Sequence, residues 1–110
     1  MEGDNSFLSI VKSNYSSGNL FNKVVGDINA HQRFSMHNDL LFTKNQLGRE
    51  VLCIPENAFL KGRRLVKIII DQAYTIIGHY GTYKTASYIH RSYWWPSMAN
   101  DIEQLSFGLL

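Results

Sequence analysis

Near the start of the chain, apolar residues recur at the spacing of an amphipathic helix: Phe7, Ile10, Val11 and Tyr15. This spacing predicts a short helix from about Ser6, and the Ser-Ser-Gly at residues 16–18 predicts its end. Residues 19–32 alternate poorly and contain turn-forming residues such as Gly26. We expect a connection there, with one further helical turn around residues 20–25.

The next pattern is typical of β-structure. Two runs rich in β-forming residues, 34–42 and 49–55, flank a turn at residues 43–48 that contains Asn45 and Gly48. Two such runs around an Asn- and Gly-containing turn predict a β-hairpin. Because an isolated hairpin is only marginally stable in water, we expect it to pack on the helices.

The second half of the chain has helical periodicity in three stretches. The first predicted helix runs from about Ala58 to Ile77, with Asn57 as its N-cap and Gly78 as the residue that ends it. The second predicted helix runs from Thr82 to about Tyr93. Pro96 suits the first position of a third helix, whose inward-facing residues are Met98, Ile102 and Leu105.

The helix predicted over residues 82–93 has two different sides. The side expected in the core carries Thr82, Ala86, Ile89 and Tyr93, and the opposite side carries Lys84, Tyr88 and Arg91. Trp94 and Trp95 follow, and we expect both to pack in the core rather than to form a ligand platform. Together these patterns predict an α+β fold that is mostly helical, with a small β-hairpin packed on a three-helix, helix-turn-helix-like bundle.

Composition restricts the class of protein. The 110 residues, 12.6 kDa, are 45% apolar and 18% charged, which suits one domain or a small domain with an ordered arm. The longest apolar run, residues 65–70, is too short to span a bilayer, and the polar start of the chain does not resemble a signal peptide. We therefore expect no membrane partner and a location in the nucleus or cytoplasm. The single cysteine, Cys53, excludes an intramolecular disulfide and is expected to be a small buried hydrophobe.

Positive charge is concentrated in two places. The formal net charge of +2 permits a nucleic-acid partner without requiring one. The predicted nucleic-acid-binding residues are a cluster in the first of the three helices and a basic, aromatic stripe on the second: Lys61, Arg63, Arg64, Lys67, Lys84, Tyr88 and Arg91. A group of charges more often forms an ordinary solvated face, and that alternative stays open.

Two motifs carry a family resemblance. Residues 78–85 read GHYGTYKT, and residues 93–98 read YWWPSM. In this order and spacing they resemble the zinc-binding N-terminal module of gypsy-type LTR retrotransposon integrases. The resemblance covers roughly residues 30–104, and it implies an N-terminal extension over residues 1–55 followed by the helical module over residues 56–110.

The resemblance implies a zinc site that this sequence does not complete. In that family two histidines and a Cys-x-x-Cys pair hold a structural zinc. Here only His79 matches, because the position of the first histidine is Gln72 and residues 105–110 contain no cysteine. The other candidates lack ligand-like spacing to His79: His31, His37, His90 and Cys53. We therefore expect zinc binding to be lost, no other cofactor, and a fold that forms without metal.

The same resemblance implies a role in DNA integration. In gypsy-type integrases this module contacts the element's DNA ends and assembles multimers, so we expect a non-catalytic module for nucleic-acid binding, oligomerisation or both. DNA and further copies of the chain are the expected partners. The alternative is a domesticated protein-protein interaction or self-association domain that does not bind DNA.

An enzyme is not expected. Catalysis in integrases belongs to a separate domain with three metal-binding carboxylates, and the chain is too short to contain it. The sequence also lacks a phosphate-binding glycine loop and a nucleophile elbow, so no small-molecule substrate is expected. Whether the chain is a fragment of a polyprotein or a free-standing gene product stays open.

Overall fold

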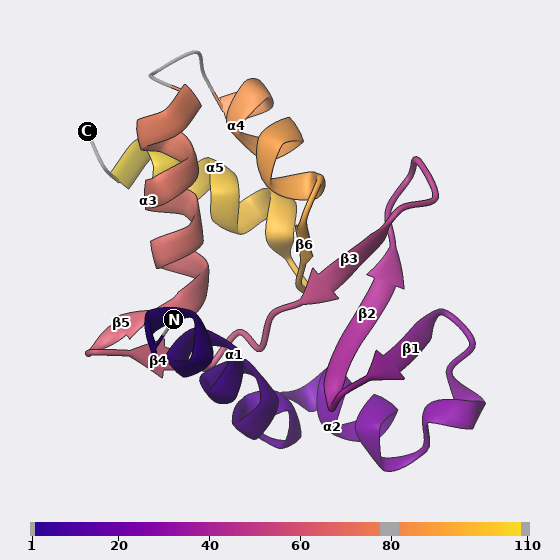
Figure 1. Cartoon of the computed structure of the whole chain (residues 1–110). Helices are drawn as coiled ribbons and strands as arrows, with labels where there is room; N and C mark the ends of the chain where they lie inside the picture. Colours follow the sequence, from indigo (N-terminus) through magenta and orange to yellow (C-terminus); the bar gives the residue numbers. More distant parts are fainter. Residues whose placement is uncertain (1, 78–81, 109–110) are drawn as a thin grey trace.

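The computed structural model describes residues 2–77 and 82–108, and the side chains of residues 7–77 and 84–104. Helices lie at both ends of the chain, and a small sheet lies between them (Figure 1). The predicted α+β, mostly helical class is confirmed. Within these ranges, every helix falls short of the length and apolar content that a membrane crossing requires.

The N-terminal part is helical for longer than predicted. Helix α1 (Glu2–Asn14) leads into a short 3-10 turn (Tyr15–Ser17), and Gly18 then separates it from α2 (Asn19–Gly26). The helix predicted near Ser6 is confirmed, while α2 is a full helix where we expected a single turn. Its buried residues, Phe21 and Val24, share one face and explain why it docks on the core.

The sheet has the strand order β1-β2-β3-β6. Strands β1 (Phe34–His37), β2 (Leu40–Lys44) and β3 (Glu50–Cys53) are antiparallel, and β6 (Tyr93–Trp94) pairs with β3 in parallel. The hairpin predicted around residues 43–48 is confirmed as the β2–β3 pair. The run at 34–42 was expected to be one strand, but it turns back on itself at residues 38–39.

The two hairpin turns of the four-stranded sheet have a clear local cause. Asn38 and Asp39 have positive φ, +54° and +64°, which is the conformation of a tight two-residue hairpin turn. At the second turn, Oδ1 of Asn45 accepts hydrogen bonds from the backbone N–H groups of Leu47 (2.9 Å) and Arg49 (3.1 Å). An asparagine that bonds its own turn in this way holds the register of the two strands.

The first of the three predicted helices begins later than expected. Residues 58–64 form a small hairpin of β4 (Phe59–Leu60) and β5 (Arg63–Arg64), and α3 spans Leu65–Ile77. The prediction of a helix from Ala58 with Asn57 as N-cap is therefore wrong. The reason is the Lys61-Gly62 turn, where φ is +53° and +81°, because a helix requires negative φ at both residues. The predicted end at Gly78 lies outside the described residues.

The second and third predicted helices also have corrected ends. Helix α4 spans Thr82–His90 rather than reaching Tyr93, because Tyr93 and Trp94 leave the helix to pair with β3. Helix α5 spans Met98–Gly108, so Pro96 precedes the helix instead of opening it. Met98 and Ile102 are buried as predicted, whereas the side chain of Leu105 lies outside the described ones.

One buried core connects the helices and the sheet. It includes Val11 from the N-terminal helix, Ile70 from α3 and Trp95, which is 0% exposed. The ring of Phe21 on α2 meets that of Trp94 on β6 edge-on, with centroids 6.0 Å apart. The two tryptophans were predicted to pack, and they do so. The division of the chain at residue 55 stays a prediction.

Candidate nucleic-acid interface

The first basic cluster is spread over a hairpin and a helix. Lys61 is exposed in the β4–β5 turn, and Arg63 and Arg64 are neighbours on β5, so they point to opposite faces. Nε of Arg64 donates to the backbone C=O of Glu56 over 3.4 Å. Lys67 lies in the first turn of α3. These residues were predicted to share one helix, and the Lys61-Gly62 turn is the reason they do not.

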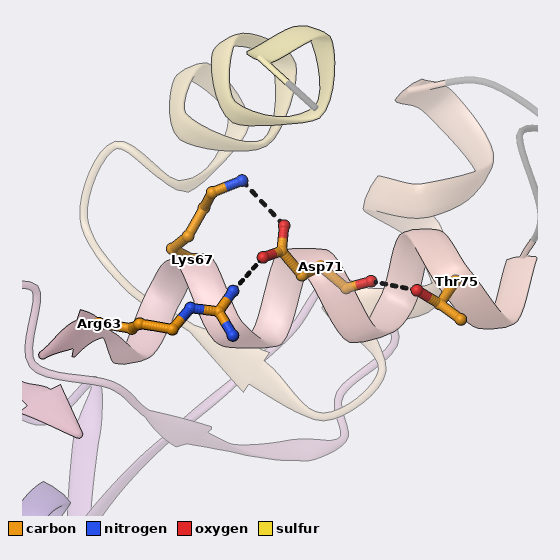
Figure 2. Close-up of polar contacts among 4 residues, drawn as sticks. All are labelled: Arg63, Lys67, Asp71 and Thr75. Carbon is orange, nitrogen blue, oxygen red and sulfur yellow. Dashed lines mark hydrogen bonds and ion pairs between the residues drawn. The ribbon is translucent and has the colours of Figure 1, made fainter. Parts of the chain in front are cut away.

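Two of the predicted cations pair with the same carboxylate, as Figure 2 shows. Arg63 Nη2 binds Asp71 Oδ2, and Lys67 Nζ lies 2.9 Å from Asp71 Oδ1. The Asp71 side chain is only 23% exposed, so water screens these contacts less than it screens a fully exposed pair. The group of three side chains therefore carries one net positive charge, rather than the two that the cations alone would supply.

Asp71 was not predicted to have this role. Its backbone C=O also accepts a hydrogen bond of 2.9 Å from Thr75 Oγ1 (Figure 2). The signal in the sequence was the four-residue spacing between Lys67 and Asp71, which places the two side chains together on a helix. Arg63 was expected on the same helix, one turn before Lys67. From that position the sequence did not indicate a contact between Arg63 and Asp71.

The second basic group, Lys84, Tyr88 and Arg91, also differs from the predicted stripe. Lys84 is exposed on α4, Tyr88 is half-buried against the core, and Arg91 lies beyond the end of the helix at His90. Tyr88 therefore has a packing role as well as an exposed edge. The prediction that all three side chains share one helical face is wrong, because α4 is shorter than expected.

Tyr88 and Arg91 meet at a shallow pocket of about 300 Å³ between α3, α4 and β6. Its lining residues are Ile69, Gln72, Ala73, Ile76, Tyr88, Ile89, Arg91, Ser92 and Tyr93. Burial, and to a smaller extent the neighbouring Tyr88, raises the pKa of the Tyr93 hydroxyl. The pocket is thus lined by apolar residues together with two tyrosines and an arginine.

The two basic groups lie at different places along α3. The β4–β5 hairpin is at the beginning of the helix, while α4 packs beside its later half (Figure 1). Ile69, Gln72 and Ile76 of α3 contribute to the pocket beside Tyr88, which agrees with this placement. A nucleic-acid ligand that contacts both groups must therefore extend along α3.

The side chains present do not fit the family's four-ligand zinc site. Gln72 is exposed on α3, its amide is a poor zinc ligand, and His79 lies outside the described residues. In the part of the chain that the structure describes, no group of three or more histidine, cysteine, aspartate or glutamate side chains could hold a metal ion. Cys53 is fully buried in β3, and burial raises the pKa of its thiol to about 12, which opposes the thiolate form that zinc requires.

Sequence reasoning also missed the cation beside the sheet. Arg33 is exposed, and its guanidinium lies over the rings of Trp94 (4.4 Å to the centroid) and Phe34 (5.3 Å). Both distances are within the range of cation–π attraction. Trp94 is far from Arg33 in the sequence, so only the fold could reveal this contact.

Comparison with known proteins finds one family model that is similar to part of the chain. No curated protein and no solved structure matches it. Residues 62–106 match the family model described as the integrase zinc binding domain, and these residues run from the β4–β5 turn through α3, α4 and β6 into α5. The match spans less than half of the chain. The helical part of this protein is thus similar to the zinc-binding N-terminal module of an integrase.

Proposed function

We propose that the chain is a non-catalytic module of a gypsy-type LTR retrotransposon integrase that contacts nucleic acid and supports assembly of the integrase. The observation that carries this proposal is the family match over residues 62–106, which takes in α3, α4 and most of α5. Integrase catalysis requires a separate, carboxylate-bearing domain. The proposed role of this chain is therefore to position DNA and protein rather than to react with either.

The exposed cations support a contact with the phosphate backbone. Lys61 in the β4–β5 turn, Lys84 on α4 and Arg91 after α4 are all exposed, so each can approach a phosphate without disturbing the core. Tyr88 at the pocket edge adds a ring on which a base or sugar can pack. Such contacts supply affinity but little sequence preference.

We also propose that the module folds without zinc. Trp95 is fully buried, and its indole N–H donates to Oδ2 of Asp101 over 2.9 Å, which fixes the start of α5 against the core. Ile70 of α3, Ile89 of α4 and Ile102 of α5 are buried in the same cluster. This apolar packing supports a stable arrangement of α3, α4 and α5 without a metal that ties them together.

The binding of duplex DNA as a function of salt tests the proposed function. Fluorescence anisotropy should give an association constant whose logarithm falls linearly with the logarithm of salt concentration between about 50 and 200 mM. Lys61→Gln or Lys84→Gln should each reduce that slope by about one, since each removes one phosphate contact. Lys12→Gln is the matched control, because Lys12 is an exposed lysine on α1, outside both basic groups. Undetectable binding, or binding that salt does not weaken, would contradict the proposal.

One observation favours the alternative of a protein-interaction domain that does not bind DNA. Asp71 already pairs with Arg63 and Lys67, so two of the predicted phosphate contacts must first leave a carboxylate. Under this alternative the chain associates with protein through other surfaces and shows no affinity for DNA. The salt titration distinguishes the two functions directly. In either case we propose a protein of the nucleus or cytoplasm.

A further inference from the structure

The pocket between α3, α4 and β6 combines an apolar lining with a volume that suits a small ring. Three of its lining residues, Ile69, Ala73 and Ile89, are buried in the core, and Tyr88 and Tyr93 add half-buried rings. Its volume of about 300 Å³ is at the lower end of the range for small-molecule sites. The size and the lining therefore suit one planar group rather than a larger ligand.

Arg91 gives the pocket a positive charge. Its side chain is exposed, and it forms no ion pair with any side chain that the structure describes. Gln72 and Ser92, which are also exposed, supply an amide and a hydroxyl that can both donate and accept hydrogen bonds. A ligand that matches this lining has a flat apolar face, a polar edge and a negative charge next to it.

We propose that this pocket receives one unpaired base of a single-stranded nucleic acid, with the neighbouring phosphate on Arg91. The proposal deepens the nucleic-acid half of the proposed function and rests on it. A base offers a flat face to the tyrosine rings and a hydrogen-bonding edge to Gln72 and Ser92. In a duplex each base is stacked on its neighbours and paired at its edge, so it enters a pocket only when it is extruded. The pocket therefore distinguishes a single strand from a duplex.

The surface beside the pocket suits a strand rather than a free nucleotide. Tyr93, a lining residue, pairs with Leu52 across β6 and β3, and Leu52 pairs with Phe42 across β3 and β2. Residues that pair directly point to the same face of a sheet, so these three side chains form one row. All three are half-buried, whereas Cys53 and Leu41 on the opposite face are fully buried. The row thus provides apolar surface on which a second base can stack next to the first.

The charges on this face of the sheet balance each other. Lys44 and Glu50 are exposed and directly opposite across β2 and β3. Oε2 of Glu50 also accepts a hydrogen bond of 3.2 Å from Ser35 Oγ and lies 3.6 Å from Nε2 of His37. The sheet therefore contributes stacking surface, and the contact with phosphate comes from Arg91.

The first test separates the contribution of the bases from that of the phosphates. The probes are a fluorescent oligothymidine and a strand of the same length whose sugars carry no bases, so the two have equal charge. In fluorescence anisotropy at one salt concentration, the full chain should bind oligothymidine roughly tenfold more tightly, which is the order expected for one stacked base. Thymidine monophosphate should displace the strand only weakly, because it can fill the pocket but not the row on the sheet.

The second test blocks the pocket. Ile76 lines it and is 63% exposed, so Ile76→Glu places a carboxylate there without disturbing the core. Thr75→Glu is the matched control, because it adds the same charge at an exposed neighbouring position of α3 that does not line the pocket. Ile76→Glu should bring the ratio of the two affinities close to one, while Thr75→Glu should leave the ratio unchanged. Circular dichroism melts show that both variants are folded.

Arg91→Gln tests the phosphate contact separately. It should weaken binding of both strands by a similar factor, since both carry the phosphate that Arg91 contacts. The slope of log affinity against log salt should become shallower by about 0.7, the value for one phosphate on a single strand.

Equal affinities of the wild-type chain for the two strands would overturn the proposal, and they are also the result expected if the pocket receives a side chain of a protein partner. A ratio that Ile76→Glu leaves unchanged would overturn it as well. Failure here is distinct from failure of the proposed function. Binding of duplex DNA that weakens with salt would still support that function, whereas absence of binding to any nucleic acid would contradict both.

Discussion

At the scale of single residues, Tyr15 shows how one polar group connects distant parts of the chain. Its hydroxyl donates to the C=O of Cys53 over 2.7 Å and accepts from the N–H of Leu41 over 3.1 Å. Burial of Tyr15 was predicted from its position on the first helix. Its two partners could not be predicted, because they depend on how β2 and β3 pass beside that helix.

Tyr15→Phe should lower the free energy of unfolding by about 1–3 kcal/mol. The substitution keeps the ring but leaves the buried C=O of Cys53 and the N–H of Leu41 without this partner. Urea unfolding followed by circular dichroism measures the change. Tyr93→Phe is a control for loss of a half-buried phenol, and it should have little effect. A change of less than about 0.5 kcal/mol for Tyr15→Phe would contradict the assigned role.

Burial also makes the core sensitive to alkaline pH. It raises the pKa of the Cys53 thiol from 9.0 to about 12, and it raises the pKa of the Tyr15 hydroxyl as well. Above about pH 9 the unfolded chain loses these protons more readily than the folded chain. The stability that they contribute is therefore complete below pH 9 and is lost as the pH rises toward the folded-state values.

The free energy of unfolding should fall by about 1–3 kcal/mol between roughly pH 8 and pH 11. Urea titrations at a series of pH values measure this fall. Cys53→Ala should be less stable at pH 8 because of the cavity, but its stability should fall less steeply with pH. If the free energy of unfolding of Cys53→Ala falls equally steeply with pH, the thiol does not contribute to the pH dependence.

At the scale of elements, the structure follows the local patterns of the sequence. Pairings between residues that are far apart in the sequence could not be predicted. The β2–β3 hairpin was predictable because Asn45 and Gly48 determine its turn within a few residues. Strand β6 was missed because Tyr93 continues the helical periodicity of residues 82–90, and its pairing with Leu52 lies far away in the sequence. The same limit applies to the candidate interface, since a late start of α3 moves Lys61 and Arg63 off the helix.

Asp71→Asn should increase the affinity for duplex DNA about three- to tenfold at low salt. The substitution releases Arg63 and Lys67 from their shared carboxylate, so both can approach phosphates. Fluorescence anisotropy with wild type and variant measures the difference. Asp27→Asn removes the same charge from an exposed position after α2 and should change affinity much less. Equal effects of the two substitutions would mean that net charge, and not Asp71, controls binding.

At the scale of the whole molecule, the α+β class was predicted correctly because the helical and β-type periodicities are both clear in the sequence. How the helical part packs against the N-terminal part could not be predicted. Trp94 pairs with Cys53 in the sheet and meets the ring of Phe21, so a residue of the helical part helps to complete the N-terminal core. This shared packing supports our proposal that the module keeps its arrangement without a zinc ion.

The metal content of the purified protein tests this central claim most directly. Elemental analysis of protein prepared without chelator should detect no stoichiometric zinc, and the Tm should be the same with and without EDTA. A protein that holds one zinc per chain and melts at a lower temperature after chelation would contradict the account.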